Sequence, residues 1–568
     1  MVLSLVNLCA KVVVSDHSSS PHWLSCVPRE LYGSLLDAAF TGCRPLAVGE
    51  LVQRWPERTL RVGGRKKPRK SPPNRLCIQA LLLAVVRGLT DPRCVLQVLD
   101  LCGLQGEEGG MGDPMGGWSL TVALCSMVLQ AKIGTQREKR REGERERKRF
   151  RAMEREKDLV KKERGQENKK SEEEARSGNS NGTDTREPVR NGEQGIGTSV
   201  ISGEEQKIKG VRRRMEMERR ESKVSGSRRE SEEIDIDSEV VMHVRADLFV
   251  NARSWERVRL AMRTVGPLKL QCRYLRVEEL TVSRIKTLLE LLPRQGLLGL
   301  DVRYSSLGVA GLTELLPQLS TFPALSSFRL YYCNLDLHRD QPGQEGTLRD
   351  LSLGLAQLKQ LSHLSFTALR LPGHLRMLLS SLSQPLEVLE MPYLSLSPSD
   401  LAYLSCSQHA STLQQLDLSE NRLDETTLPS VRRLLSQASG NLQHLCLSGC
   451  GLTDRLLGAL LPSLSCCRAL KSLGLSLNPL SMAGLLDLVR TAVRMPSLRQ
   501  LLYPNPLEDY QPGLPELPSS AQLLDWPLDE LMEVHATHSQ LNRVVTESGR
   551  SDLFLTCDLI NYDKDLVE

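Results

Sequence analysis

The stretch that decides the fold is LQQLDLSENRL at residues 413–423. The same pattern, LxxLxLxxNxL, returns as LQHLCLSGCGL at 442–452 and as LKSLGLSLNPL at 470–480. In each copy the LxL alternation puts two leucines on one side of a short strand. Asn421 and Asn478 follow their strands and are placed to hydrogen-bond the backbone of the turn. This repetition predicts a leucine-rich-repeat solenoid.

Looser copies extend the repetition in both directions, at steps of 25 to 36 residues, and begin at Val265, Leu297, Leu325, Leu361, Leu386 and Leu498. Cys333 and Cys450 take the asparagine position in two copies. After Asn421, a helix with an apolar stripe is predicted from the helical spacing of Leu428, Val431, Leu434 and Leu435. One repeat cannot bury its leucines alone, whereas stacked neighbours can. We therefore predict an α/β horseshoe of the ribonuclease-inhibitor type, with its strands on the concave side.

Segments outside the clear repeats extend the solenoid and close its ends. Leu96, Leu99 and Leu101 form an isolated copy, residues 118–131 are helix-like, and residues 241–251 alternate like a strand. A helical C-terminal cap is predicted over 524–548 from the stripe Leu528, Leu531, Val534, His538, Leu541 and Val545, with His538 as a packing residue and Gly549 as the stop. The predicted divisions are an N-terminal helical cap (1–60), a first repeat-like unit with helices (61–131), a charged insert (132–238), the repeats (239–510) and the C-terminal cap (511–568).

The charged insert differs in composition from everything around it. Residues 136–230 contain a single leucine, Leu159, and a single aromatic, Phe150. They carry 29 Lys and Arg against 21 Asp and Glu, a balance of 29 − 21 = +8, whereas the rest of the chain has 45 − 48 = −3. Such a stretch cannot bury a core, so we expect solvated disorder or a transient helix. Because the basic excess lies there without stacking aromatics, a nucleic-acid-binding role is disfavoured.

The motifs that carry catalysis are missing from the sequence. It contains no GxxxxGK[ST], HExxH or GxSxG, no CxxC pair and no Cys and His at zinc-ligand spacing. The prediction is therefore a protein that is not an enzyme and has neither cofactor nor metal. Fifteen scattered cysteines favour reduced thiols and the cytosol, while RKKPRK at 65–70 is either a nuclear import signal or a solvated loop. The sequence contains no run of 18 apolar residues, so it predicts no membrane span.

The N-terminus contains an amphipathic pattern that resembles the elongin-binding BC-box. The matching residues are Ser4, Leu5, Cys9 and Val13. On a helix, Leu5, Cys9 and Val13 lie at i, i+4 and i+8 and share one face. The resemblance implies that Leu5 anchors in a pocket of elongin C and that the small Cys9 allows close approach. The alternative is an ordinary core helix.

The segment VPRELYGSLL that follows resembles the cullin-2 box. The matching residues are Val27, Pro28, Leu31 and Leu35. Pro28 suits the first turn of a helix, where its missing N–H is not needed. Because Pro-x-Glu-Leu also opens an F-box and Trp55 lies where an F-box often ends, an F-box-like adaptor of Skp1 stays open as an alternative. A capping helix would need the same apolar spacing.

Six longer segments together resemble the PRAME family, namely 27–40, 50–56, 95–101, 244–251, 473–485 and 501–510. The resemblance covers nearly the whole chain apart from the insert. It implies a leucine-rich horseshoe that serves as the non-catalytic substrate receptor of a cullin-2–elongin B/C ubiquitin ligase. The open alternative is a scaffold or inhibitor of a signalling complex, for example of the NF-kappa-B type, without ubiquitination.

The protein substrate is expected on the concave strands, at the x positions of the repeat, and no small-molecule substrate is expected. These positions are Arg303, Tyr304, Arg329, Tyr331, Tyr332, Tyr393, Asp417, Glu420 and His444. Tyrosine and arginine are frequent hot-spot residues in protein interfaces. The alternative is an ordinary solvent-exposed strand surface.

Overall fold

The computed structural model describes nine stretches of the chain, 5–15, 26–62, 74–91, 93–104, 116–176, 242–335, 344–370, 372–529 and 534–557. The chain divides into two compact units. The first consists of Met1–Thr135 together with Glu239–Glu568, and the second is Gln136–Ser238. The first unit contains the repeats and is the horseshoe of this article.

One parallel sheet runs through the whole horseshoe, with thirteen described strands in the order of the chain. The strands are β1 (Thr59–Arg61), β2 (Val98–Asp100), β3 (Met242–Asn251), β4 (Leu268–Glu278), β5 (Gly299–Arg303), β6 (Ser327–Tyr331), β7 (His363–Thr367), β8 (Val388–Glu390), β9 (Gln415–Asp417), β10 (His444–Cys446), β11 (Ser472–Gly474), β12 (Gln500–Tyr503) and β13 (Phe554–Cys557). Parallel neighbours need crossover connections, and here most of these contain a helix.

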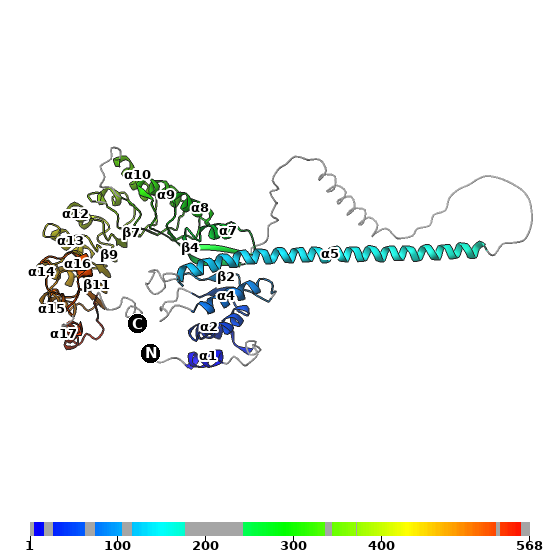
Figure 1. Ribbon diagram of the computed structural model, residues 1–568, viewed down its shortest axis with the longest axis horizontal. Coiled ribbons are helices and arrows are strands. Elements are labelled where there is room, and N and C mark those ends of the chain that lie inside the picture. Colours follow the sequence, from blue (N-terminus) through cyan, green and yellow to red (C-terminus); the bar gives the residue numbers. More distant parts are fainter. Residues whose placement is uncertain are drawn as a thin grey trace, which may run out of the picture. The chain divides into compact units, whose positions relative to one another are not determined.

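Figure 1 shows helices α8, α9, α10 and α12 on the outside of the arc and strands β4, β7 and β9 on its inside. The helices of the repeats are α7 (Trp255–Arg263), α8 (Val282–Leu291), α9 (Gly308–Leu319), α10 (Gln344–Ala356), α11 (Leu375–Leu379), α12 (Pro398–Cys406), α13 (Leu428–Ala438), α14 (Asp454–Ser465) and α15 (Met482–Ala492). In α13 the predicted stripe is confirmed, because Val431, Leu434 and Leu435 are buried and Leu428 packs against the core.

The first leucine of each LxL pair forms a continuous ladder across the sheet. Leu416 pairs with Leu389 on one side and with Leu445 on the other, and all three are buried. The ladder continues to Leu473 and Leu501. Each repeat thus buries its leucines against its neighbours, which confirms the predicted solenoid.

Asn421 joins two repeats from a fully buried position. Its Nδ2 donates to the carbonyl oxygens of Met391 at 2.7 Å and Leu418 at 2.9 Å, and its Oδ1 accepts from the amide of Leu396 at 3.1 Å. Asn478 repeats the arrangement with Leu447, Leu475 and Leu452. The predicted role of the asparagine is confirmed.

Cysteine fills the same position with different chemistry. The Cys450 thiol donates to the carbonyl oxygen of Leu418 at 3.2 Å, and the Cys333 thiol to that of Val302 at 3.3 Å. A thiol offers no strong acceptor, so the amide of Leu423 bonds instead to the backbone carbonyl of Cys450, at 2.9 Å.

One predicted repeat copy is out of register. The copy that begins at Val265 would align Leu268 and Leu270 with the later LxL pairs, but Leu275 and Val277 are the residues that pair with Leu300 and Val302. The cause is the length of β4, whose first half pairs only with β3, across an irregularity between Ala246 and Leu248. Both halves alternate apolar and polar residues, and sequence alone gives no reason to prefer the second.

The N-terminal part of the horseshoe is a stack of helices that leads into the sheet. It contains α1 (Leu5–Ser15), the 3-10 helix η2 (Arg29–Leu31), α2 (Tyr32–Thr41), α3 (Pro45–Gln53) and α4 (Arg75–Gly88). Each of the four α-helices contacts the next. The isolated copy at Leu96 is confirmed as β2, where Leu99 pairs with Leu60 of β1 and Val244 of β3. Strand β1 was not predicted.

Helix α5 (Gly116–Arg176) begins in the horseshoe and continues into the second unit. The predicted helix at 118–131 is confirmed, with Leu124, Cys125, Met127, Val128 and Ala131 buried. Residues 136–155 remain helical, and their described side chains are almost all exposed. Of the two states expected for the insert, its first part is therefore helical here, and residues 177–238 lie outside those described. None of the helices in the described stretches is both long and apolar enough to cross a membrane.

The C-terminal end differs from the predicted single cap helix. It contains η3 (Leu507–Asp509), α16 (Ser520–Asp525), α17 (Val534–Glu547) and the unpredicted strand β13, which extends the sheet beyond β12. His538 stacks on Tyr503 and its Nδ1 lies 3.0 Å from the phenol oxygen, so its packing role is confirmed. Gly549, with φ of +68°, follows the end of α17 as predicted.

Candidate protein-interaction surfaces

Helix α1 presents most of its apolar side chains to solvent. Only Ala10 and Val14 are buried, against the following helix α2. The exposed residues include Leu5, whose side chain is 77% exposed, and Val12, at 70%, together with Val6, Leu8, Cys9 and Val13. A helix that is apolar on nearly all sides is stable in water only when more of its surface is covered.

The predicted BC-box residues lie within this exposed surface, which we call the α1 stripe (Leu5, Cys9 and Val13). All three are exposed, and the helical spacing places them on one face. Ser4 lies outside the described residues. The core-helix alternative therefore accounts for Ala10 and Val14 and leaves the α1 stripe without a function in the described part of the fold.

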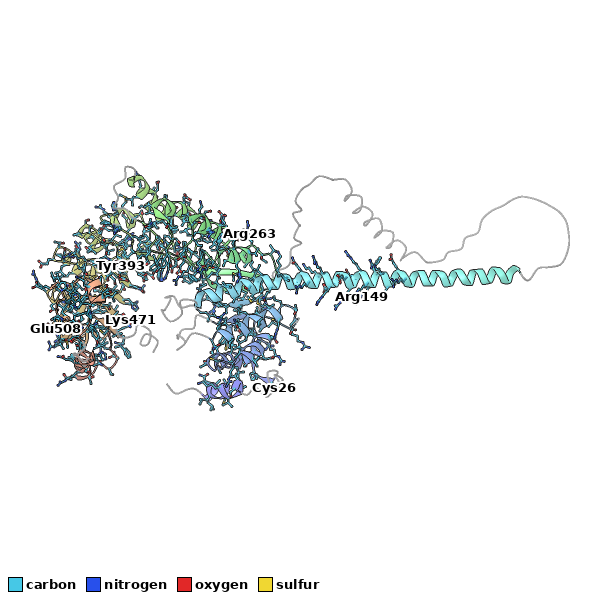
Figure 2. The ribbon with its side chains drawn as sticks, viewed as in Figure 1. Cys26, Arg149, Arg263, Tyr393, Lys471 and Glu508 are labelled. Carbon is cyan, nitrogen blue, oxygen red and sulfur yellow. The ribbon has the colours of Figure 1, made fainter. Side chains whose placement is uncertain are left out.

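The predicted cullin-2 residues are divided between surface and core. Pro28 precedes η2 and accepts a hydrogen bond from the amide of Leu31 through its carbonyl oxygen, at 3.1 Å. Pro28 and Leu31 are exposed, and Val27 is partly buried. Leu35 is only 5% exposed and belongs to the core, so a contact between Leu35 and a partner is the wrong part of that prediction. Figure 2 labels Cys26, where the described chain resumes before η2.

Trp55 packs within the same cap. Its ring meets that of the buried Tyr32 edge to face, with centroids 6.2 Å apart, and its Nε1 donates to the carbonyl oxygen of Thr59 at 3.1 Å. These contacts explain the residue through packing between α2 and β1, so an F-box is not needed to account for it.

On strands β4 and β5 of the concave face, each acidic side chain pairs with an arginine of the same strand. On β4, Arg276 Nε donates to Glu278 Oε1 at 3.0 Å, and on β5 Arg303 Nη2 lies 2.8 Å from Asp301 Oδ2. Burial lowers the pKa of Arg303, but the hydrogen bond to Asp301 and the charge of that carboxylate raise it by more, so the pKa is raised overall. The guanidinium also lies over the ring of Tyr331, 4.3 Å from its centroid. The structure thus brings together Arg303 and Tyr331, two of the residues predicted for the substrate surface.

Four of the predicted residues lie just beyond their strands, one position after β5 and β6 and three positions after the shorter β8 and β9. Tyr304, Tyr332, Tyr393 and Glu420 occupy equivalent turns of their repeats and share a left-handed backbone with φ between 50° and 61°. Their amides bond to carbonyls of the next repeat, for example Tyr304 to Tyr331 at 2.9 Å. This geometry aligns the side chains in one row along the edge of the sheet, which we call the tyrosine edge.

The tyrosines of this edge are all about half exposed, at 55% for Tyr304 and 49% for Tyr332 and Tyr393. The rings of Tyr304 and Tyr332 are stacked, with centroids 5.5 Å apart and an interplanar angle of 12°. Figure 2 labels Tyr393 on the horseshoe. Exposed, rigid aromatic rings in a row provide the kind of surface that protein interfaces use as hot spots.

The remaining predicted residues lie on the strands themselves. Arg329 lies in the middle of β6 and Asp417 at the end of β9, both partly buried, and His444 is exposed at the start of β10. Asp417 accepts hydrogen bonds from the amide and hydroxyl of Ser419, at 2.8 and 2.5 Å, and burial raises its pKa.

Sequence reasoning missed Tyr274, Arg276 and Glu278 on the same face, because the Val265 copy was out of register. With the register of Leu275 the three residues fall on the x positions. Among the described residues, no group of three or more His, Cys, Asp or Glu is arranged to hold a metal ion.

Both the N-terminal and the C-terminal parts of the horseshoe match domains of a known protein family. Residues 3–108 match the PRAME N-terminal domain, and residues 253–515 match the PRAME C-terminal domain. Leucine-rich repeat-containing protein 14 of Xenopus laevis is 32% identical over 579 residues, which cover 98% of this chain and 97% of that protein.

Two human proteins match over shorter lengths. Human leucine-rich repeat-containing protein 14 is 38% identical over 322 residues, 56% of this chain and 65% of its own length. PRAME family member 12 is 41% identical over 140 residues, 25% of this chain and 29% of its own length. With both domains matched and a relative aligned from end to end, the chain belongs to the PRAME family.

Proposed function

We propose that this protein is a non-catalytic substrate receptor of a cullin-2–elongin B/C ubiquitin ligase. The single observation that carries the proposal is the exposed α1 stripe, in which Leu5, Cys9 and Val13 follow the BC-box spacing on a helix whose only buried residues are Ala10 and Val14. Elongin C would cover the stripe, and the concave face would hold the substrate. Transfer of ubiquitin would then become effectively intramolecular, because both partners are tethered.

Cullin-2 would contact the chain beside elongin C, through Pro28 and Leu31. Both side chains are exposed, and both are fixed by η2, whose turn is closed by the bond from the Leu31 amide to the Pro28 carbonyl oxygen. Val27 and Leu35 would support this turn from the core.

The test is co-purification of the full chain with elongin C and elongin B. Leu5→Ala with Cys9→Asp should abolish recovery, because burying one leucine contributes roughly 1.5–3 kcal/mol and a carboxylate would enter an apolar contact. Leu46→Ala is the matched control, since Leu46 of α3 is equally exposed but lies outside the stripe. Unchanged elongin recovery from the double variant, with an unaltered melting temperature, would refute the proposal.

A second pair of substitutions separates the cullin contact from the elongin contact. Pro28→Ala with Leu31→Ala should lose cullin-2 and keep elongin C, because these side chains lie outside α1. Recovery of Skp1 in place of elongin would favour the F-box alternative. A partner whose abundance does not respond to proteasome inhibition would favour a scaffold without ubiquitination.

A further inference from the structure

The two ends of the tyrosine edge differ in how their carboxylates are neutralised. On β4 and β5 an arginine of the same strand pairs with each acidic side chain. At β9, Asp417 is bonded to Ser419, and Glu420 accepts from the Ser520 hydroxyl at 2.6 Å and from Tyr393. Burial raises the pKa of both carboxyl groups, and hydroxyl or amide donors, not cations, oppose that shift. Among the described contacts, these two carboxyl groups therefore have hydroxyl and amide donors but no cationic partner.

Aromatic rings lie beside these carboxylates. The side chains of Tyr332 and Tyr393 flank Ala368, which occupies the same left-handed position in the repeat between them. Neighbouring strands of a sheet are about 4.8 Å apart, so the two tyrosines start roughly 10 Å apart with only a methyl group between them. That spacing admits one extended side chain between the rings. The Tyr393 hydroxyl lies close enough to Glu420 to lower the pKa of that carboxyl group, against the larger effect of burial.

A buried hydroxyl next to this gap has no partner. Thr367, the residue before Ala368, is only 6% exposed, and its Oγ1 makes no hydrogen bond. Buried polar atoms are nearly always hydrogen-bonded, so an orphaned one points to a group that is absent.

Helix α16 limits the edge on the far side. Its first residue, Ser520, bonds to Glu420 across the repeats, and the Glu420 side chain covers Gly449 of the next turn. Figure 1 shows α16 beside β9. The open part of the edge therefore ends where its carboxylates lie.

We propose that this end of the edge, formed by Tyr332, Ala368, Tyr393, Asp417 and Glu420, binds a lysine or arginine side chain from a basic segment of the protein substrate. The inference rests on the proposed function, because it names the class of substrate that the receptor holds. Aromatic faces attract an ammonium or guanidinium group, and the carboxylates supply the opposite charge. Nucleic acids and acidic segments would be repelled.

The test measures fluorescence anisotropy of the full chain with labelled twelve-residue probes of glycine and serine interspersed with lysine or arginine. Matched probes carry glutamine or glutamate at the basic positions. We expect the basic probes to bind and the matched probes to bind at least about tenfold more weakly. Equal binding of the glutamine probe, or tighter binding of the glutamate probe or of a single-stranded oligonucleotide, would overturn the inference.

Variants assign the binding to named side chains. Tyr393→Ala and Glu420→Gln should each weaken the lysine probe by about fivefold or more, whereas Tyr393→Phe should retain most of the affinity because it keeps the ring. Glu314→Gln is the control, since Glu314 is an exposed carboxylate of α9 that pairs with Lys286 away from the edge. Thermal melting of each variant checks folding. Unchanged affinity in folded Tyr393→Ala and Glu420→Gln would overturn the assignment.

Elongin recovery from the same preparations separates this inference from the proposed function. Loss of the basic probe with elongin C still bound would refute only the substrate class. Binding of the basic probe by a chain that does not recover elongin C would leave the edge as a basic-segment site and refute the ligase role.

Discussion

Replacing Asn421 by alanine tests whether the repeats are held together by their buried asparagines. The side chain is fully buried and joins the repeats of β8 and β9 through four hydrogen bonds of 2.7 to 3.2 Å. Alanine would leave the amide of Leu396 without its acceptor and the carbonyl oxygen of Met391 without this donor. Leu418 would keep a donor, because its carbonyl oxygen also accepts from the Cys450 thiol.

The expected loss of unfolding free energy follows from these bonds. An orphaned buried donor costs about 1–3 kcal/mol, and each lost hydrogen bond about 0.5–1.5 kcal/mol, so Asn421→Ala should cost about 3 kcal/mol. Asn441→Ala is the matched control, because the exposed Asn441 donates one hydrogen bond, to Ser411 at 2.7 Å. Its loss should cost about 1 kcal/mol or less. Asn421→Cys should fall between, since a thiol can donate to the Met391 carbonyl but cannot replace the acceptor.

Urea unfolding followed by circular dichroism gives the difference in stability, and hydrogen exchange of the segment around Leu396 gives the local effect. The Leu396 amide should exchange faster in Asn421→Ala and Asn421→Cys, and at the normal rate in Asn441→Ala. A loss below about 1 kcal/mol, or the same loss in both alanine variants, would refute the reasoning.

Three further predictions concern the edge and the insert. Gly449→Ala should lower the melting temperature more than Gly451→Ala, because both glycines have positive φ but only a Cβ at Gly449 would overlap the Glu420 carboxylate; equal losses would contradict this. Asp417→Asn should stabilise the protein at pH 7, because burial raises the pKa of Asp417 in the fold, so stability falls as pH rises through that pKa. The gain should shrink near pH 4, about the unfolded pKa, and a gain independent of pH in thermal melts would refute it. Replacing residues 140–236 by about 20 Gly and Ser residues should leave the melting temperature of the horseshoe unchanged, because its described core has no member between Ala131 and Met242; a large loss would show that the insert stabilises it.

Much of the horseshoe could be predicted because its repeats obey local rules. LxL alternation places Leu416 and Leu418 inside, and the asparagine that follows has few places to bond except the turn. The predicted register was wrong in β4, where two apolar alternations fit the repeat pattern equally well. Only the pairing of β4 with β5 selects Leu275 and Val277.

The candidate surfaces show the same division. Helical spacing put Leu5, Cys9 and Val13 on one face, and Leu31 and Leu35 on a second. Spacing cannot say which of these faces the core, because a docking helix and a capping helix use the same residues. Packing of α1 against α2 leaves the α1 stripe exposed, whereas Leu35 of α2 lies in the core.

The sequence by itself determined the repeat, the leucine ladder, the asparagine positions and the charge division between horseshoe and insert, because each depends on residues close together in the chain. The tertiary structure alone decided the register of β4, the added strands β1 and β13, and the exposure of α1. It also placed Ser520 on Glu420 and aligned Tyr332 and Tyr393 in one row. These features arise from contacts between residues far apart in sequence, which no local pattern encodes.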